Sequence, residues 1–127
     1  MGQAAPGFKK HPDHIVYITA LPGTYIQSFG DVEIARSTQV LEVTESRHMT
    51  RLYFPVQDID LSCLEEADHM SYCPFKGEAR YWTVKGGALS LQDGAWAYDD
   101  PYEECVTLKD HICFYAEKDG FSLKKEG

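Results

Sequence analysis

The chain has 127 residues, 43% of them hydrophobic and 25% charged, and a formal net charge of -8 at pH 7. This length fits one domain with a hydrophobic core. The acidic charge argues against nucleic acid or an anionic membrane as partner, because both attract basic faces. No apolar run approaches the ~20 residues of a membrane span, and the N-terminus lacks the apolar core of a signal peptide. We therefore expect a cytoplasmic protein.

Strands are predicted wherever β-branched and aromatic residues cluster between turn residues. In chain order these segments are 14–21 (HIVYITAL), 24–29 (TYIQSF), 32–37 (VEIARS), 38–43 (TQVLEV), 49–54 (MTRLYF), 78–84 (EARYWTV), 88–91 (ALSL), 95–98 (AWAY), 111–117 (HICFYAE) and 121–125 (FSLKK). Glycine adopts the positive φ that tight turns require, so hairpins are predicted at glycine-containing pairs between these segments. These pairs are Gly30 with Asp31, Gly86 with Gly87, Asp93 with Gly94 and Asp119 with Gly120.

Helix is predicted to be minor, because no stretch holds an apolar period of 3.6 residues over three turns. Segment 56–68 is predicted as a loop with at most one helical turn. We therefore expect an all-β, antiparallel, hairpin-rich single domain over residues 11–118. Residues 1–10 are expected to form a flexible N-terminus, and residues 119–127 a C-terminal hairpin end and tail.

The four cysteines, Cys63, Cys73, Cys105 and Cys113, are expected to be free thiols, since a cytosolic chain of this size needs no disulfide. Cys63, His69 and Cys73 are close in sequence, and thiolate and imidazole suit zinc. Their spacing is C-x5-H-x3-C, however, no CxxC pair exists, and a fourth ligand has to come from the distant later cysteines or histidine. We expect no bound metal.

Two other kinds of chemistry are considered from short patterns. Cys73 with His69 as base is a candidate nucleophile, although Pro74 follows and flanking aromatics are typical of a buried, inert thiol. The DID sequence at 58–60 matches the spaced aspartates of nucleotidyltransferases, but no Gly-Ser helix start precedes it. Neither GxxxxGK[ST] nor GxGxxG is present, so no cofactor is predicted.

A pocket assembled from strands is the remaining candidate site. Glu42 interrupts the apolar VLEV sequence, so it either faces solvent or is buried beside a cation, for which Arg36 and Lys76 are the candidates. A buried Glu–Lys pair among aromatics is typical of acid–base catalysis, although a structural ion pair produces the same pattern. The catalytic candidates are Glu42, Lys76, Tyr53 and Tyr98; the substrate-binding candidates are Arg36, Ser37, His69, Cys73, Tyr81, Trp82 and Trp96.

Several motifs occur in an order that resembles one family. These are HPDHIV, FGDVEIARS, LEV, LYFPVQDI, HMSYCPFKGEARYW, GAWAYDDP and HICFYAEK, and the block CP[FY]KG-x-A-x-YW is the most specific. Over residues 11–118 the chain is similar to the family catalogued as domain of unknown function 427, also labelled a nucleotidyltransferase domain. The resemblance implies a small β domain similar to the tent-like Mss4 and methionine sulfoxide reductase B folds.

The resemblance also places individual residues. Arg36 stands where family members commonly carry aspartate, IARS instead of IADS, which points to an altered ligand or a specialised relative. Cys73 belongs to the family pattern, whereas the other three cysteines do not. We expect Pro74 and Gly77 to shape a bend, from which Lys76 projects toward a cavity lined by tyrosine and tryptophan.

The favoured function is a cofactor-independent enzyme that acts on a small organic molecule by proton transfer, as an isomerase, cyclase or lyase does. In this hypothesis Glu42 is the base, Lys76 stabilises an oxyanion, and Tyr53 or Tyr98 delivers a proton. One alternative is a non-catalytic module that binds a small acidic or aromatic ligand through Arg36, Lys76 and the tryptophans. Another is assembly into a homodimer through an exposed β edge.

Overall fold

The computed structural model describes residues 3–126. In this part the strands are Val16–Ala20 (β1), Thr24–Phe29 (β2), Val32–Ser37 (β3), Leu41–Glu45 (β4), Arg51–Pro55 (β5), Leu64–Cys73 (β6), Gly77–Gly86 (β7), Leu89–Ala97 (β8), His111–Phe114 (β9) and Phe121–Glu126 (β10). The helical elements are one turn of α-helix, Gly7–Lys10 (α1), and the 3-10 segments Val56–Asp58 (η1), Leu61–Cys63 (η2) and Glu103–Leu108 (η3). The predicted all-β fold with minor helix is confirmed.

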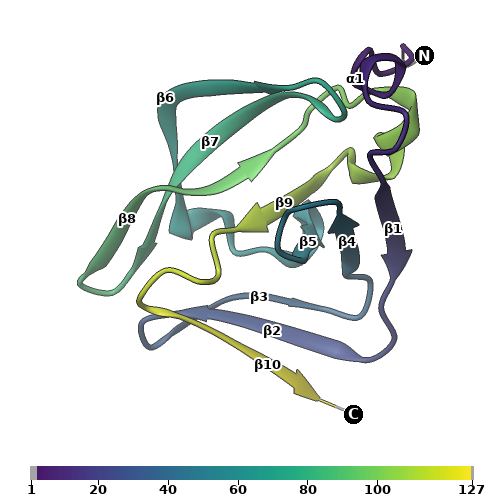
Figure 1. Ribbon diagram of the computed structural model, residues 1–127. Helices are drawn as coiled ribbons and strands as arrows, with labels where there is room; N and C mark the ends of the chain where they lie inside the picture. The colour runs from purple at the N-terminus through teal and green to yellow at the C-terminus, as the bar shows by residue number, and fades with distance from the viewer. Residues whose placement is uncertain (1–2, 127) are drawn as a thin grey trace.

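The strands form two antiparallel sheets (Figure 1). The larger has seven strands in the order β1-β4-β5-β9-β8-β7-β6, and the smaller has three in the order β10-β2-β3. The predicted turn at Gly30 and Asp31 joins β2 to β3, with Phe29 opposite Val32. No helix among the described residues is both long enough and apolar enough to cross a membrane.

The prediction of a loop over 56–68 is wrong for residues 64–68, which belong to a strand, whereas residues 56–63 contain the two short segments η1 and η2. β6 begins at Leu64 and pairs with β7 as far as Cys73 opposite Gly77. Most side chains of β6 are exposed, because it is an edge strand of the large sheet. Its polar sequence therefore lacks the apolar alternation by which strands are predicted.

The predicted hairpin turn at Asp93 and Gly94 is also wrong, because β8 continues through this pair. Trp82 lies opposite Ala95, and the β7–β8 register shifts before the pairing resumes at Val84. Asp93 has a φ of 57°. Together with Gln92, the two residues therefore form a bulge inside a long strand, which remains paired with β7 on both sides.

The predicted C-terminal hairpin between 111–117 and 121–125 does not form. β10 instead joins the small sheet, where Phe121 lies opposite Phe29 of β2 and their ring centroids are 4.6 Å apart. This pairing places an aromatic ring of β10 over Phe29, which is 2% exposed. The last residue, Gly127, lies outside the described residues.

The expected flexible N-terminus, residues 1–10, makes specific contacts in its described part. Ala5 and Gly7 are buried, and the Gly7 N–H donates to the Pro74 carbonyl at 2.9 Å. The Phe8 ring packs on Phe75 at a centroid distance of 4.9 Å. This segment therefore contacts the β6–β7 loop, while residues 1–2 lie outside the described part.

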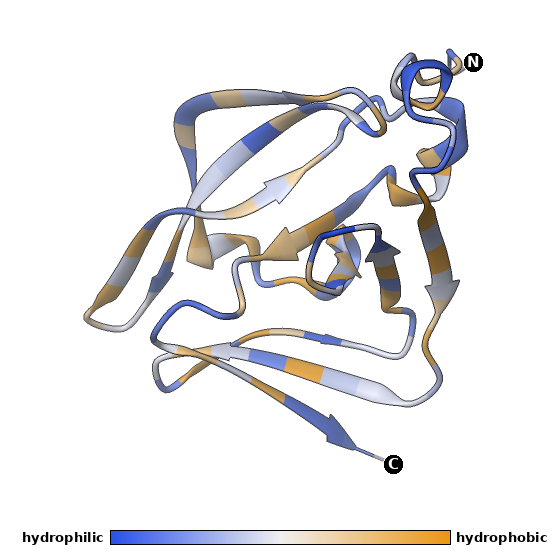
Figure 2. Ribbon diagram, in the orientation of Figure 1, coloured by the Kyte–Doolittle hydropathy of each residue, from blue (hydrophilic) through white to orange (hydrophobic). Residues whose placement is uncertain are grey.

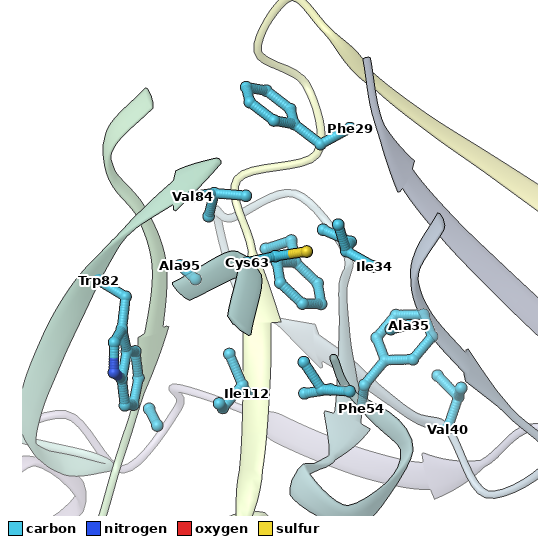
Figure 3. Packing of buried hydrophobic residues seen from close by; sticks show 13 residues of the cluster. Phe29, Ile34, Ala35, Val40, Phe54, Cys63, Trp82, Val84, Ala95 and Ile112 are labelled. Carbon is cyan, nitrogen blue, oxygen red and sulfur yellow. The ribbon is translucent and has the colours of Figure 1, made fainter. Parts of the chain in front are cut away.

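The buried side chains form two clusters. In the first, Phe29, Ile34 and Val40 face Trp82 and Val84 across the space between the sheets (Figure 3). Figure 2 shows that β9, in the middle of the large sheet, is mainly hydrophobic, whereas β10 ends in hydrophilic residues. The burial of apolar side chains from both sheets explains why the sheets pack together.

The second cluster lies on the other part of the large sheet, and it forms the base of the candidate site. Its buried members are Val43, Tyr53, Ala79, Tyr98, Cys105, Leu108 and Cys113. Two of these seven carry a hydroxyl group and two carry a thiol, so this core is considerably more polar than the first. Hydroxyl groups in a core need hydrogen-bond partners, and the adjoining cavity is a place where such partners can be found.

Candidate functional site

A cavity of about 460 Å³ lies beside the second cluster. It is lined by Val43, Glu45, His48, Met49, Arg51, Tyr53, Tyr72, Cys73, Pro74, Phe75, Lys76, Tyr81, Trp96, Tyr98 and Tyr115. These residues come from β4, β5, β6, β7 and β8, from the β4–β5 and β6–β7 loops, and from the segments that follow β8 and β9. The volume and the aromatic lining are typical of small-molecule sites.

A buried ion pair between Glu45 and Lys76 lies at the cavity. Side chains alternate between the faces of a strand, so Glu45 at the end of β4 shares the buried face of Val43. Lys76 comes from the three-residue loop between β6 and β7, and its Nζ donates to Glu45 Oε1. Glu45 is 9% exposed and Lys76 6%, so both charges are nearly removed from bulk water.

His14 holds the other oxygen of the same carboxylate. Its Nε2 lies 2.7 Å from Glu45 Oε2 and donates to it, because an ionised carboxylate only accepts. The imidazole stacks on the Phe75 ring with a centroid distance of 3.8 Å and an interplanar angle of 13°. Glu45 therefore joins the start of β1 to the loop that carries Lys76.

The hydrogen bonds keep Glu45 ionised. Burial by itself raises the pKa of a carboxyl group, but the bonds from Lys76 and His14 outweigh this effect and lower the pKa of Glu45 below its ordinary value. His48 Nε2 lies 3.8 Å from Glu45 Oε2, and its side chain is 62% exposed at the rim. An imidazole that reaches both the solvent and the cavity is a suitable group for transferring protons between the two.

Two buried tyrosines complete the cavity floor. Tyr53 is 2% and Tyr98 8% exposed. Trp96 Nε1 donates to the Tyr53 hydroxyl oxygen at 3.2 Å. Burial raises the pKa of both phenols well above the ordinary value, so both hydroxyl groups remain protonated and act as donors.

Aromatic rings and one guanidinium form the opposite wall. The Trp96 and Tyr115 rings are perpendicular at 5.5 Å, and the Arg51 guanidinium lies 5.1 Å and 5.2 Å from their centroids. Arg51 is held by Glu117 through two hydrogen bonds. The bulge in β8 fixes this wall, since the Tyr115 N–H donates to the Gly94 carbonyl at 2.8 Å.

Six of the eleven candidate residues line the cavity, namely Tyr53, Cys73, Lys76, Tyr81, Trp96 and Tyr98. Glu42 does not line it, and the carboxylate beside Lys76 is Glu45. The expected pairing of Glu42 with Lys76 is therefore wrong: Glu42 lies on the face of β4 opposite to Val43 and Glu45.

The other four candidates lie elsewhere. Arg36 is an exposed β3 residue that pairs with Glu33 and Glu126, so it does not provide the expected cation beside Glu42. The Ser37 hydroxyl donates to Asp58 at 2.6 Å. His69 is exposed, with its ring 4.4 Å from that of Tyr81, and Trp82 is buried in the first cluster.

Sequence reasoning missed Glu45, His14, His48 and Arg51. The sequence could have indicated Glu45. If the predicted strand 38–43 is extended by two residues, Leu41, Val43 and Glu45 fall on the same face of it. No local pattern indicates the other three, since their roles depend on contacts between distant segments.

The cysteines and the DID aspartates have structural environments. Cys63 belongs to the first cluster and Cys73 lines the cavity, while burial raises the pKa of Cys105 to about 11. Asp58 binds Ser37, and Asp60 accepts from the Ser62 N–H at the start of η2. Within residues 3–126, no group of three or more His, Cys, Asp or Glu side chains is arranged to hold a metal ion.

The fold and site define an all-β protein with an aromatic pocket over a buried carboxylate–ammonium pair. A family model described as a domain of unknown function, DUF427, and named NTP_transf_9, matches residues 23–124. The chain therefore belongs to the DUF427 family. No curated protein matches it. The matched range holds Glu45 and Lys76 but not His14, and the similarity to Mss4 stays a prediction.

Proposed function

We propose that the protein is a cofactor-independent enzyme that acts on a small organic molecule by acid–base catalysis, as an isomerase, cyclase or lyase does. The observation that supports it most is the ionised Glu45 beside the Lys76 ammonium at an aromatic cavity. In the proposed step Glu45 removes a proton from a carbon next to a carbonyl group. The electron pair moves to the carbonyl oxygen, which Lys76 stabilises as an enolate, and a proton then returns to the product.

Ligand binding itself makes Glu45 a better base in this proposal. A carboxylate whose pKa is lowered by hydrogen bonds is a weak base while those bonds last. When a ligand oxygen binds another N–H of Lys76, it draws the ammonium away from Glu45 and weakens one of the two hydrogen bonds that lower the carboxyl pKa. The effect of burial, which raises the pKa, then counts for more. The base is therefore activated only when the ligand is in place.

A non-catalytic binding module is the second candidate, and one observation favours it. Both oxygens of Glu45 already accept hydrogen bonds, an arrangement that also suits a fixed counter-ion for Lys76. In that case the cavity binds its ligand without proton transfer, and Glu45 only positions the ammonium.

Proton exchange in D₂O separates the two candidates. The probe is 2-tetralone, whose C–H groups next to the carbonyl exchange slowly for deuterium and are followed by ¹H NMR. We expect the protein to accelerate exchange and Glu45→Gln to reduce it about a hundred- to ten-thousand-fold, the usual range for a general base. Glu42→Gln, the same change on the opposite face of β4, is the matched control and should exchange like the wild type.

One result would contradict the proposed catalytic role of Glu45. If 2-tetralone binds, as judged by protein chemical-shift changes, but exchanges at the same rate with wild type and Glu45→Gln, the catalytic role of Glu45 is wrong. The binding module is then the better description.

A further inference from the structure

The Tyr98 hydroxyl is a donor without a partner among the described residues. Its side chain is among the buried ones, it lines the cavity, and no hydrogen bond to it is made within residues 3–126. The Tyr98 hydroxyl is not one of the fully buried side-chain atoms that lack a partner, so it is open to the cavity, where a ligand or water can bind it. The cavity is the place from which a partner can reach Tyr98.

Two neighbouring groups on the cavity floor offer donors as well. An ammonium has three N–H donors, and Glu45 Oε1 is the one acceptor that Lys76 Nζ has within the described part. Tyr53 accepts from Trp96, which leaves its own O–H without an acceptor in the same part of the chain. The floor therefore offers donors to a ligand.

The carboxylate acceptor of the cavity is already in use. Glu45 is the only carboxylate among the lining residues, and its two oxygens accept from Lys76 and His14. A ligand that brings hydrogen-bond donors consequently finds little to bind on the floor. A ligand that brings a full negative charge, such as a carboxylate, finds both lysine and arginine of the lining already paired, Lys76 with Glu45 and Arg51 with Glu117.

The walls restrict the body of the ligand. The rings of Tyr81 and Trp96 lie 6.3 Å apart and tilted by 44°, and Tyr115 stands across Trp96. Aromatic faces of this kind pack best against a flat or cyclic apolar body. Lys76, Tyr53 and Tyr98 are then left to bind the polar end.

We infer that the ligand is a cyclic or aromatic carbonyl compound whose single acceptor oxygen binds the Tyr98 hydroxyl and the Lys76 ammonium. This inference rests on the proposed function, because it assigns the substrate class of the same pocket. The neutral oxygen suits the uncharged start of the reaction. The negative charge that develops on it meets donors that are already in place.

Three probes of similar size test which polar group of the ligand the pocket binds. 2-Tetralone has a carbonyl, tetralin lacks it, and 2-naphthoate carries a carboxylate. Dissociation constants are measured by chemical-shift titration of the full chain at pH 7. We expect 2-tetralone to bind about tenfold tighter than tetralin, because one or two hydrogen bonds from the donors on the cavity floor contribute at this level. 2-Naphthoate is expected to bind more weakly than 2-tetralone.

Tyr98→Phe is the decisive variant. Its hydroxyl has no protein partner, so the melting temperature should stay close to that of the wild type while the advantage of 2-tetralone over tetralin disappears. Tyr17→Phe, at an exposed position on β1, is the control and should keep the advantage. Equal binding of 2-tetralone and tetralin by the wild type, an advantage that persists in Tyr98→Phe, tighter binding of 2-naphthoate, or no binding of any probe overturns the inference.

The two proposals fail separately. Binding that depends on Tyr98 without proton exchange supports the ligand class and contradicts catalysis. Exchange that depends on Glu45 but is unaffected by Tyr98→Phe supports catalysis and contradicts the assigned oxygen site.

Discussion

At the scale of single residues, Glu45 connects the two sides of the pocket. It binds His14 from the start of the chain and Lys76 from the β6–β7 loop, and all three side chains are largely shielded from solvent. Attraction between buried charges is strong, but so is the cost of removing them from water. The intact pair therefore adds little to the free energy of unfolding, whereas removal of one partner is strongly destabilising because it leaves the other charge buried and unpaired.

The first prediction concerns this destabilisation. Glu45→Gln and Lys76→Met should each lower the free energy of unfolding by about 3–5 kcal/mol, because each leaves a buried charge without its counter-charge. The double variant should lose clearly less than the sum of the singles. Urea unfolding at pH 7 measures all three, with Glu42→Gln expected within about 0.5 kcal/mol of wild type. Strict additivity of the two singles would contradict a coupled pair.

The second prediction is a pH dependence. The pKa of Glu45 is lower in the folded protein than in the unfolded chain, so the unfolded chain binds its proton first as the pH falls. Stability from Glu45 is thus present above the ordinary carboxyl pKa, near 4.5, and is lost as the pH falls through the lower folded-state value. The stability gap between wild type and Glu45→Gln should narrow from pH 7 toward pH 3.

This comparison of variants is needed because Glu33 and Glu117 also have lowered pKa values, owing to hydrogen bonds from arginines, and they act in the same direction. Both remain present in the two proteins that are compared. A gap that stays constant over the whole range would show that Glu45 does not carry the stabilising charge.

At the scale of elements, the two sheets meet where β7 ends beside β2. A Cβ atom on Gly86 would lie 2.2 Å from the Phe29 carbonyl oxygen, a distance that backbone atoms cannot tolerate. The next residue, Gly87, has a φ of 60° and open space around the corresponding position. Two adjacent glycines thus serve different purposes, one a close approach of backbones and the other a turn.

The third prediction uses this contrast. Gly86→Ala should lower the free energy of unfolding by about 3 kcal/mol or more, because the added methyl group forces the sheets apart. Gly87→Asn, which accepts positive φ and points into open space, should cost about 1 kcal/mol or less. Urea unfolding followed by circular dichroism measures both. A tolerated Gly86→Ala would mean that β7 and β2 separate easily.

At the scale of the whole molecule, each core cluster has its own tryptophan. Trp82 is buried in the first cluster, and Trp96 packs against the second beside the pocket. β10 crosses from the region of β9 to the small sheet and lies beside β2 there (Figure 1). These long-range pairings connect the clusters, so the chain is expected to unfold as one cooperative unit.

The fourth prediction tests whether the chain unfolds as one cooperative unit. In Trp96→Phe the remaining fluorescence reports the first cluster, and in Trp82→Phe it reports the second. Within each variant, the fluorescence and far-ultraviolet circular dichroism transitions in urea should coincide. If the pocket signal of Trp82→Phe changes at clearly lower urea than the circular dichroism, the pocket side forms a separate, weaker unit.

The sequence alone determined the β class and most strands, because apolar alternation and glycine turns are local properties. It also indicated Lys76, Tyr53, Tyr81, Trp96 and Tyr98, which lie in or beside strongly patterned aromatic segments. It did not indicate β6 or the destination of β10, since an exposed edge strand has no alternation and a strand does not encode its partner locally.

Only the tertiary structure decided which carboxylate stands beside Lys76. Glu42 and Glu45 lie three positions apart on β4, so they face opposite sides of the strand, and sequence composition cannot distinguish them. The choice is made by the buried face of Val43 together with His14, which is 31 positions away from Glu45. A buried charge is tolerated only where such distant partners converge, and that convergence is a property of the fold.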